Sequence, residues 1–232
     1  MNFAIPPAPQ ASVGIAASRD RFPVRRIYCV GRNYAAHARE MGIDPSNSSP
    51  IFFCKPADAV VPANGSKSVS VPYPPQTKDF EHEIELVVAI GRGGREIACS
   101  AALDYVFGYA VGLDMTRRDL QANARKRGEP WDTAKAFDHS APIGSLYPVS
   151  CVGHPESGAI WLDVNGKRRQ EADLEQLIWT VPDIIHHLSY YFELAPGDLI
   201  YTGTPSGVGP VKPGDTLVGG IDELGEISVR IN

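Results

Sequence analysis

The chain consists largely of short apolar runs divided by turn residues, a pattern that predicts a β-rich fold. The run from Ile84 to Ile90 is made of the β-branched and aliphatic residues that suit a buried strand. Asn165-Gly166 lies between two extended segments and predicts a hairpin over residues 159–173. Other apolar runs predict strands at residues 25–31, 105–115, 199–203, 216–220 and 223–232.

Helical signals are fewer, and they predict short helices around the strands. Thr116 and Asp119 form a Thr-x-x-Asp cap, which begins a helix expected to end near Arg127. Gly128 follows as the stop. A second helix is expected over residues 183–193. Together with the strands, these segments predict a β-rich α+β fold with short peripheral helices.

Proline and glycine are spread along the whole chain, which predicts a single domain. The 20 prolines and 22 glycines suit a fold rich in turns, and no segment has the composition of a linker. We therefore expect one domain over residues 23–232. Residues 1–22 are rich in proline and alanine and predict a loosely ordered leader. They have no basic segment followed by an apolar one, so they do not resemble a secretory signal.

Charge and cysteine content narrow the classes of function. A net charge of −5 with scattered lysine and arginine argues against nucleic-acid binding, which favours a concentrated basic face. No apolar run approaches the roughly 18 residues of a membrane span, so we expect no membrane association. The 4 cysteines lie far apart without a Cys-x-x-Cys pair, which is typical of reduced, mostly buried thiols in a cytoplasmic protein.

Two carboxylates interrupt the most apolar strand of the chain. Glu83 and Glu85 face the same side, about 6.6 Å apart along an extended strand. Unpaired in a semi-buried site they would repel each other, and a hard divalent cation would remove that repulsion by taking their oxygens as ligands. A solvated strand face is the alternative, and it is the commoner explanation of an isolated Glu-x-Glu.

Asp114 is a third candidate ligand, because it lies at the end of another apolar strand and directly before a predicted helix. It could instead support the start of that helix electrostatically. The helix also places Arg118 and Gln121 on one face, where an arginine and an amide suit an anionic, oxygen-rich substrate. A solvated helix face explains the same spacing equally well.

A short alanine-rich helix is predicted between Asn33, a suitable N-cap, and Gly42. Within it His37 and Glu40 are three residues apart, so the imidazole and the carboxylate can touch. A glutamate that holds a histidine makes it a better general base toward water. Such a short helix is marginal alone and could order over a bound substrate as a lid. An ordinary surface contact is the alternative.

Five motifs occur in the order known from one protein family. They are YCVGRNYAAHAREMG, FEHEIEL, YAVGLDMTRRDLQ, WDTAKAFDHSAPIG and IYTGTPSGVGPVKPGD. Together they resemble the fumarylacetoacetate hydrolase family over nearly everything after Pro23, and within it most nearly the short acylpyruvate and fumarylpyruvate hydrolases. The resemblance implies a mixed β-sandwich roll, a homodimer and a bound Mg²⁺ or Mn²⁺.

The resemblance also implies three groups of site residues, carried over position by position. The metal ligands are Glu83, Glu85 and Asp114. The catalytic residues are His37, Glu40 and Lys135. The substrate-binding residues are Arg118, Gln121 and Thr204. Without the motifs, Lys135 is typical of a surface lysine, and the segment around Thr204 is typical of a glycine-rich turn.

These residues suit hydrolysis of the carbon–carbon bond in an acylpyruvate, a 2,4-dioxo acid. His37, held by Glu40, would take a proton from water, the hydroxide would attack the distal carbonyl, and the metal and Lys135 would stabilise the departing pyruvate enolate. Fumarylpyruvate, split into fumarate and pyruvate during aromatic-acid breakdown through gentisate, is the expected substrate.

Three other functions remain open from the sequence. Two share the site: decarboxylation of oxaloacetate, and isomerisation or decarboxylation of other dicarboxylic 2-oxo acids. Neither needs an activated water, so dependence on His37 and Glu40 separates them from the hydrolase. The third is a non-catalytic β-protein stabilised by metal, which would keep the three acids but turn over no 2-oxo acid.

Overall fold

The apolar run that follows Glu83 forms the centre of the larger of two main sheets. In the computed structural model, strand β8 spans Ile84–Ile90, and all of its residues are buried. Ile84 and Leu86 belong to the core between the two main sheets, whereas Val87 and Ala89 belong to a second core on the opposite face. Because both faces of β8 are covered, its residues are apolar without alternation, with Glu85 as the exception. The structure describes residues 2–40, 42, 49–63 and 67–232.

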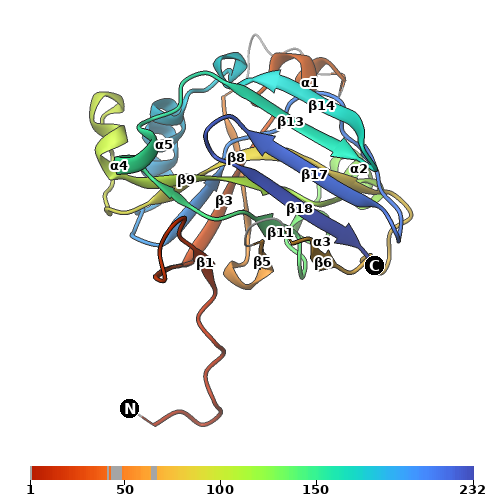
Figure 1. Ribbon diagram of the computed structural model, residues 1–232, viewed down its shortest axis with the longest axis horizontal. Coiled ribbons are helices and arrows are strands. Elements are labelled where there is room, and N and C mark those ends of the chain that lie inside the picture. Colours follow the sequence, from red (N-terminus) through yellow and green to blue (C-terminus); the bar gives the residue numbers. More distant parts are fainter. Residues whose placement is uncertain (1, 41, 43–48, 64–66) are drawn as a thin grey trace.

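The larger sheet is mixed and has the strand order β4-β3-β15-β8-β9-β11-β5 (Figure 1). Strand β12 pairs with β9 beside this path. The pairs β15–β3 and β11–β5 are parallel, and the other pairs are antiparallel. The remaining bounds are β3 Arg26–Gly31, β4 Ile51–Lys55, β5 Val60–Pro62, β9 Val106–Leu113, β11 Ala141–Ile143, β12 Tyr147–Pro148 and β15 Asp198–Tyr201.

A second sheet, in the order β14-β13-β17-β18-β6, packs against the first through the shared core. Asn165 and Gly166 connect β13 to β14 with φ of 52° and 73°, as a two-residue hairpin turn requires, so the predicted hairpin is confirmed. The two packed sheets confirm the predicted β-rich α+β class with a mixed β-sandwich roll. The strands of the second sheet are β6 Val69–Val71, β13 Ala159–Val164, β14 Lys167–Asp173, β17 Thr216–Ile221 and β18 Glu226–Ile231.

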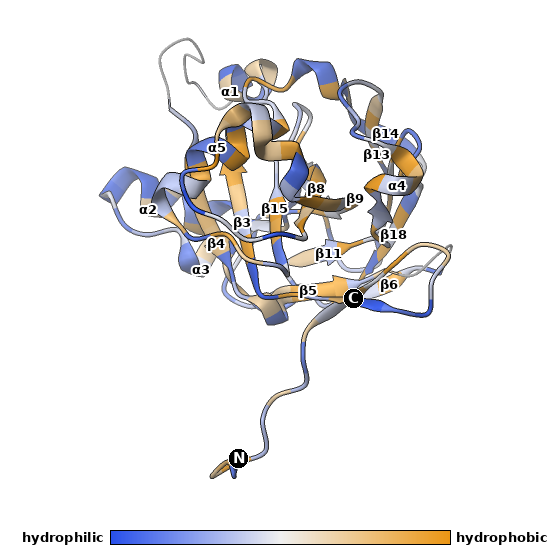
Figure 2. Ribbon diagram, turned by 90° about the vertical axis from the view of Figure 1, so that its left-hand side faces the viewer, coloured by the Kyte–Doolittle hydropathy of each residue, from blue (hydrophilic) through white to orange (hydrophobic). Residues whose placement is uncertain are grey.

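Short helices and two small sheets surround this sandwich. Figure 2 shows hydrophobic residues concentrated along the inner strands, whereas α2 on the outside is largely hydrophilic. The helices are α1 Ala35–Glu40, α2 Arg118–Arg127, α3 Asp132–Lys135, α4 Val149–Val152 and α5 Val181–Tyr191, with 3-10 helices at Ala57–Ala59, Cys99–Tyr105 and Leu174–Gln176. The small sheets are β1-β2, of Ser12–Gly14 and Arg21–Pro23, and β10-β7-β16, of Thr116–Arg117, Phe80–His82 and Gly209–Pro210.

Ordered structure begins earlier than the composition predicts. Strand β1 pairs with β2 inside the segment expected to be a loosely ordered leader. Val13 and Phe22 are buried, and they cover the outer face of the larger sheet. Apolar side chains on that face need a cover, and this hairpin supplies part of it. The N-terminal end of the chain, before Gln10, projects away from the body (Figure 1).

The helix predicted to begin at Thr116 begins two residues later. Thr116 lies in β10, and α2 begins at Arg118. Asp119 does not complete a cap with Thr116, because its carboxylate accepts hydrogen bonds from Thr77 Oγ1 (2.6 Å) and the Lys78 backbone (2.9 Å). The end of α2 is as predicted, since Gly128 adopts the left-handed conformation with φ of 68°.

Asn33 also has a different role from the predicted N-cap. It is fully buried, and its side-chain oxygen accepts a hydrogen bond from Trp179 N at 2.6 Å. Its amide nitrogen donates to the backbone oxygens of Trp179 and Thr202 at 2.9 and 2.8 Å. This one side chain therefore ties the segment before α1 to the approach to α5 and to the chain that leaves β15.

The exposure of the cysteines differs from the expectation. All four cysteines are free thiols, but only Cys29 is buried, so the expectation of mostly buried thiols is wrong. None of the helices in the described ranges has the length and apolar character needed to cross a membrane.

Candidate active site

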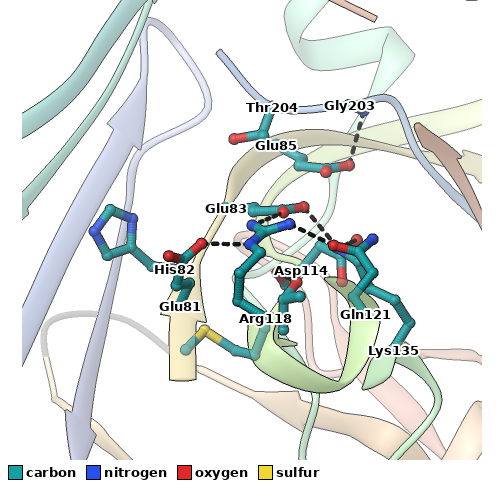
Figure 3. Close-up of polar contacts among 12 residues, drawn as sticks. Glu81, His82, Glu83, Glu85, Asp114, Arg118, Gln121, Lys135, Gly203 and Thr204 are labelled. Carbon is teal, nitrogen blue, oxygen red and sulfur yellow. Dashed lines mark hydrogen bonds and ion pairs between the residues drawn. The ribbon is translucent and has the colours of Figure 1, made fainter. Parts of the chain in front are cut away.

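A one-residue break between two strands positions the first carboxylate. Glu83 separates β7 from β8, and its backbone oxygen accepts a hydrogen bond from Asp114 N at 2.8 Å. This bond sets Asp114, at the end of β9, beside Glu83. Glu85 follows in β8, opposite Gly112 of β9. The ligand atoms of Glu83, Glu85 and Asp114 all lie within 4.8 Å of one another, so the predicted convergence of three carboxylates exists (Figure 3).

Two buried lysines face these carboxylates. Lys135, at the end of α3, donates hydrogen bonds to Glu83 Oε2 at 2.7 Å and to Asp114 Oδ2 at 2.8 Å. It is 2% exposed, which excludes the alternative of a surface lysine. Lys55 Nζ lies 2.8 Å from Asp114 Oδ1 and is equally buried. Lys55 is not among the residues predicted from the sequence, and its one local signal is its place at the end of an apolar strand, which it shares with Asp114.

Each of the three guanidinium nitrogens of Arg118 donates to a protein acceptor. Its Nε donates to Glu81 Oε2 at 2.5 Å, one terminal nitrogen donates to Gln121 Oε1 at 2.6 Å, and the other to Glu83 (Figure 3). Burial alone would lower the pKa of this guanidinium, but the carboxylates of Glu83 and Glu81 raise it above its ordinary value. Arg118 is thus a permanent cation that orients Glu83 and Gln121.

The charges of this cluster make it suitable for a divalent cation. Burial and the neighbouring carboxylates of Asp114 and Glu83 raise the pKa of Glu85 well above its usual range. Burial acts in the same direction on Glu83, but Lys135 and Arg118 outweigh it and hold the pKa of Glu83 below its usual range. A cation that takes the oxygens of such crowded carboxylates as ligands removes the repulsion between their negative charges.

Asp114 Oδ1 supports the same conclusion. It is buried and accepts no hydrogen bond from the described residues, since its contact with Lys55 is an ion pair without hydrogen-bond geometry. Buried carboxylate oxygens seldom lack a donor, and one that does has a lone pair available for another ligand. Three buried carboxylates with such an oxygen among them fit Mg²⁺ or Mn²⁺, both of which prefer oxygen ligands.

The predicted contact between His37 and Glu40 lies in the pocket that also contains the three carboxylates. His37 Nδ1 is 3.2 Å from Glu40 Oε2, and the imidazole is buried although the carboxylate is partly exposed. The Glu40 carboxylate also accepts a longer hydrogen bond from Gly207 N at 3.3 Å. Helix α1 is therefore tied to the loop that follows β15, and each contributes a lining residue, His37 and Thr204, to the pocket that contains the three acids.

Thr204 lies at the cleft, but its hydroxyl is occupied by the protein. It donates to the Ile84 backbone oxygen at 2.8 Å and accepts from Gln170 Nε2 at 2.8 Å. The preceding residue is more directly linked to the acids, because Gly203 N donates to Glu85 Oε2 at 2.8 Å. In this arrangement Thr204 holds the loop against β8, which positions Glu85.

Gln170 of β14 is a supporting residue that the sequence analysis missed. Its buried side chain donates to Thr204 Oγ1 and Pro205 O, and it accepts from Ile84 N at 3.1 Å. The same oxygen lies 2.9 Å from His82 Nδ1. Gln170 therefore joins the second sheet to both sides of the strand break at Glu83. No local pattern marks it, because its partners are far away in the sequence.

Replacing Gln170 by leucine is expected to lower the free energy of unfolding by about 3 kcal/mol, because several buried polar groups lose their partner. Urea unfolding measures this change. The exposed Gln176→Leu is the matched control and is expected to stay within about 0.5 kcal/mol of wild type. Equal stability of the two variants would contradict the bridging role of Gln170.

The acids, the lysine and the histidine open into one cleft. Its walls include apolar and aromatic residues as well as charged ones. Besides the residues already described, the cleft is lined by Val30, Gly31, Arg32, Phe53, Arg125 and Trp131. All nine site residues predicted from the sequence lie at or beside this cleft, and eight of them line it directly; Glu40 contacts it through His37.

Comparison with known proteins gives a consistent picture. The family described as "Fumarylacetoacetate (FAA) hydrolase C-terminal" matches residues 26–232. "Fumarylpyruvate hydrolase" from Ralstonia sp is 43% identical over 189 residues, which cover 82% of this chain and 96% of that protein. "Oxaloacetate tautomerase FAHD1, mitochondrial" from Arabidopsis thaliana is 43% identical over 206 residues, 89% of this chain and 90% of the relative.

A solved structure is more similar still. The crystal structure of fumarylpyruvate hydrolase from Pseudomonas aeruginosa in complex with Mn²⁺ and pyruvate has a TM-score of 0.98 and 57% sequence identity. The match covers 99% of each chain. That protein therefore shares the whole fold described above.

Proposed function

Since the chain belongs to the fumarylacetoacetate hydrolase family, we propose that it is a metal-dependent hydrolase that cleaves the carbon–carbon bond of an acylpyruvate. The observation that carries the proposal is a single cleft in which a histidine–glutamate pair faces three buried carboxylates and a buried lysine. Fumarylpyruvate, split into fumarate and pyruvate, is the substrate we propose. A structural relative that binds Mn²⁺ and pyruvate supports the pyruvate half of this choice.

Each group in the cleft has a role in this reaction. Glu83, Glu85 and Asp114 would hold Mg²⁺ or Mn²⁺. When bound, the cation would supply Lewis-acid polarisation of the 2-oxo acid head. With Nδ1–H donated to Glu40, His37 keeps a lone pair on Nε2 and takes a proton from water there.

Bond changes balance with water as the only co-substrate. The hydroxide oxygen bonds to the distal carbonyl carbon, and the carbon–carbon bond to the pyruvate fragment breaks. Its electron pair passes to the pyruvate enolate, and the proton held by His37 returns to that fragment. The Lys135 ammonium, buried beside Glu83 and Asp114, stabilises the negative charge as it develops. Gln121 and Arg118 line the same cleft as polar contacts for substrate oxygens.

A second candidate is isomerisation or decarboxylation of a dicarboxylic 2-oxo acid such as oxaloacetate. It is favoured by relatives that are 43% identical and carry the name oxaloacetate tautomerase. This chemistry moves a proton or expels CO₂ without an activated water. Dependence of the rate on His37 therefore separates the two candidates.

Removal of metal is expected to abolish activity. Protein treated with a chelator should lose hydrolysis of acylpyruvates, and Mg²⁺ or Mn²⁺ should restore it. The three carboxylates are Lewis bases, so without a cation they cannot polarise the 2-oxo acid head. The measurement is loss of the enol absorbance for a panel of acylpyruvates and oxaloacetate, with pyruvate release as the second readout. Full activity in metal-free protein would refute the assignment, and no turnover of any 2-oxo acid would favour a non-catalytic metal-stabilised protein.

We also propose that residues 23–232, together with the β1–β2 hairpin that packs on them, act as a single catalytic domain and that the protein is a cytoplasmic homodimer. The dimer follows from the family resemblance. Light scattering during size-exclusion chromatography tests it, and a mass equal to one chain would contradict it.

A further inference from the structure

Two arginines at the cleft remain without a role in the proposed reaction. Arg32 follows the last residue of β3, and Arg125 lies near the end of α2, one turn beyond Gln121. Both line the cleft that contains the acids and His37. Residues 118, 121 and 125 share one helix face, so Arg125 continues the row that Arg118 begins.

Neither of these arginines is neutralised by a residue that the structure describes. Over residues 2–40, 42, 49–63 and 67–232, neither guanidinium takes part in an ion pair or a side-chain hydrogen bond, whereas Arg118 has three acceptors. Both guanidiniums line one cleft, and partial burial, followed by the positive charge of Arg125, lowers the pKa of Arg32. Two guanidiniums that line one cleft, without a partner among the described residues, suit an anion that binds both.

The backbone holds Arg32 in a conformation that a residue with a side chain seldom adopts. Its φ is 64°, in the left-handed region. The next residue is the fully buried Asn33, whose three hydrogen bonds fix the chain at this point. Strained backbone of this kind persists where the surroundings enforce it, and it is common at ligand sites.

The cleft therefore has three chemically different parts. The acids and Lys135 form the first, and the second is an apolar wall that includes Phe53 and Trp131, whose rings meet edge-on at 5.8 Å. The two arginines form the third. Lysine and arginine outnumber aspartate and glutamate in the lining by four to three, so the cleft is positive even before a cation binds, which favours a dianion over a monoanion.

We propose that Arg32 and Arg125 bind the distal carboxylate of a dicarboxylic acylpyruvate and select it over acylpyruvates with an uncharged acyl end. The inference rests on the proposed function, because it takes the 2-oxo acid head to lie at the three carboxylates. It assigns the specificity of the site to residues other than Arg118.

Arg125→Met and Arg32→Asn test this inference with fumarylpyruvate and acetylpyruvate as paired substrates. Asparagine tolerates the left-handed backbone at position 32, and methionine suits a helix. Each variant is expected to lower kcat/KM for fumarylpyruvate about 10- to 100-fold, the usual effect of losing a charge-assisted hydrogen bond. With acetylpyruvate, which lacks that carboxylate, the loss should stay below about threefold. Arg125→Lys should recover part of the loss.

The exposed Lys126→Met is the matched control, since it removes the same charge from the same helix outside the cleft. It should change neither substrate's kcat/KM by more than about twofold. An equal loss with both substrates in Arg125→Met, or a loss of the same size in Lys126→Met, would overturn the inference.

A binding measurement keeps the inference separate from the proposed function. Calorimetry with Mn²⁺-loaded protein compares fumarate with crotonate, in which a methyl group replaces one carboxylate. Wild type should bind fumarate at least about tenfold more tightly, and Arg125→Met should lose that preference. If wild type cleaves no acylpyruvate but shows this pattern, the reaction is wrong and the dicarboxylate site stands. Absence of the preference in wild type, or its persistence in the variant, overturns the site.

Discussion

Replacing His37 by asparagine is expected to lower the rate of acylpyruvate hydrolysis about 10²- to 10⁴-fold, the usual cost of removing a general base. The reason lies in the geometry of the pair. His37 Nδ1 contacts Glu40 at 3.2 Å, which leaves Nε2 to accept the proton of the attacking water. Asparagine preserves polarity at this buried position but has no titratable nitrogen. Steady-state kinetics on fumarylpyruvate measure the loss.

Metal binding in the same variant should remain close to wild type, because His37 is not one of the three carboxylate residues that would hold the ion. Turnover of oxaloacetate, where present, should fall much less than hydrolysis. The matched control is His139→Asn, since His139 is exposed and its φ of 61° suits asparagine. A His37→Asn protein that hydrolyses acylpyruvate at nearly the normal rate would show that the pair is only a structural contact.

Replacing Lys135 by methionine is expected to cost about 3–5 kcal/mol of unfolding free energy in metal-free protein. Lys135 is the shared hydrogen-bond donor of Glu83 and Asp114, and both carboxylates are buried. Without the ammonium, two buried acids face each other and Glu85 with less compensation. For a chain of this length the loss corresponds to a fall in Tm of roughly 10 °C.

Added Mn²⁺ should raise the Tm of Lys135→Met more than that of wild type, since the cation restores positive charge between the same carboxylates. Hydrolysis should stay low even so, because the ion does not replace the ammonium beside the developing enolate. Lys212→Met, an exposed substitution, should leave Tm within about 2 °C of wild type. Equal stabilisation by Mn²⁺ in wild type and in Lys135→Met would show that Lys135 does not compensate the negative charge of the carboxylates that hold the metal.

Several strands and turns could be predicted from the sequence because their signals are local, whereas short strands such as β4 and β11 were not predicted. The apolar run of β8, the Asn165-Gly166 turn and the Gly128 stop each depend on a few neighbouring residues. The order of the segment before residue 23 could not be predicted in this way. Val13 and Phe22 are held by the outer face of the larger sheet, whose strands come from distant parts of the chain.

The same distinction applies to the cleft. Glu83, Glu85 and Asp114 lie at strand ends or in alternation along a strand, where residue type and spacing predict convergence. Lys55 and Gln170 complete the site through contacts 60 to 88 residues away, with the backbone of Met115 and with His82. Taken locally, each is an ordinary polar residue of a strand. Only the packing of the two sheets gives them a role.

The position of β3 has a consequence for how the protein is made. In the larger sheet β3 has β4 on one side and β15 on the other, and β15 ends at Tyr201. During synthesis β3 can pair with β4 early, but its parallel neighbour emerges only after most of the chain. Non-local parallel pairing of this kind forms slowly. We therefore expect the sheet, and with it the cleft between α1 and the loop after β15, to close last, so that the ion joins a nearly finished protein instead of guiding its folding.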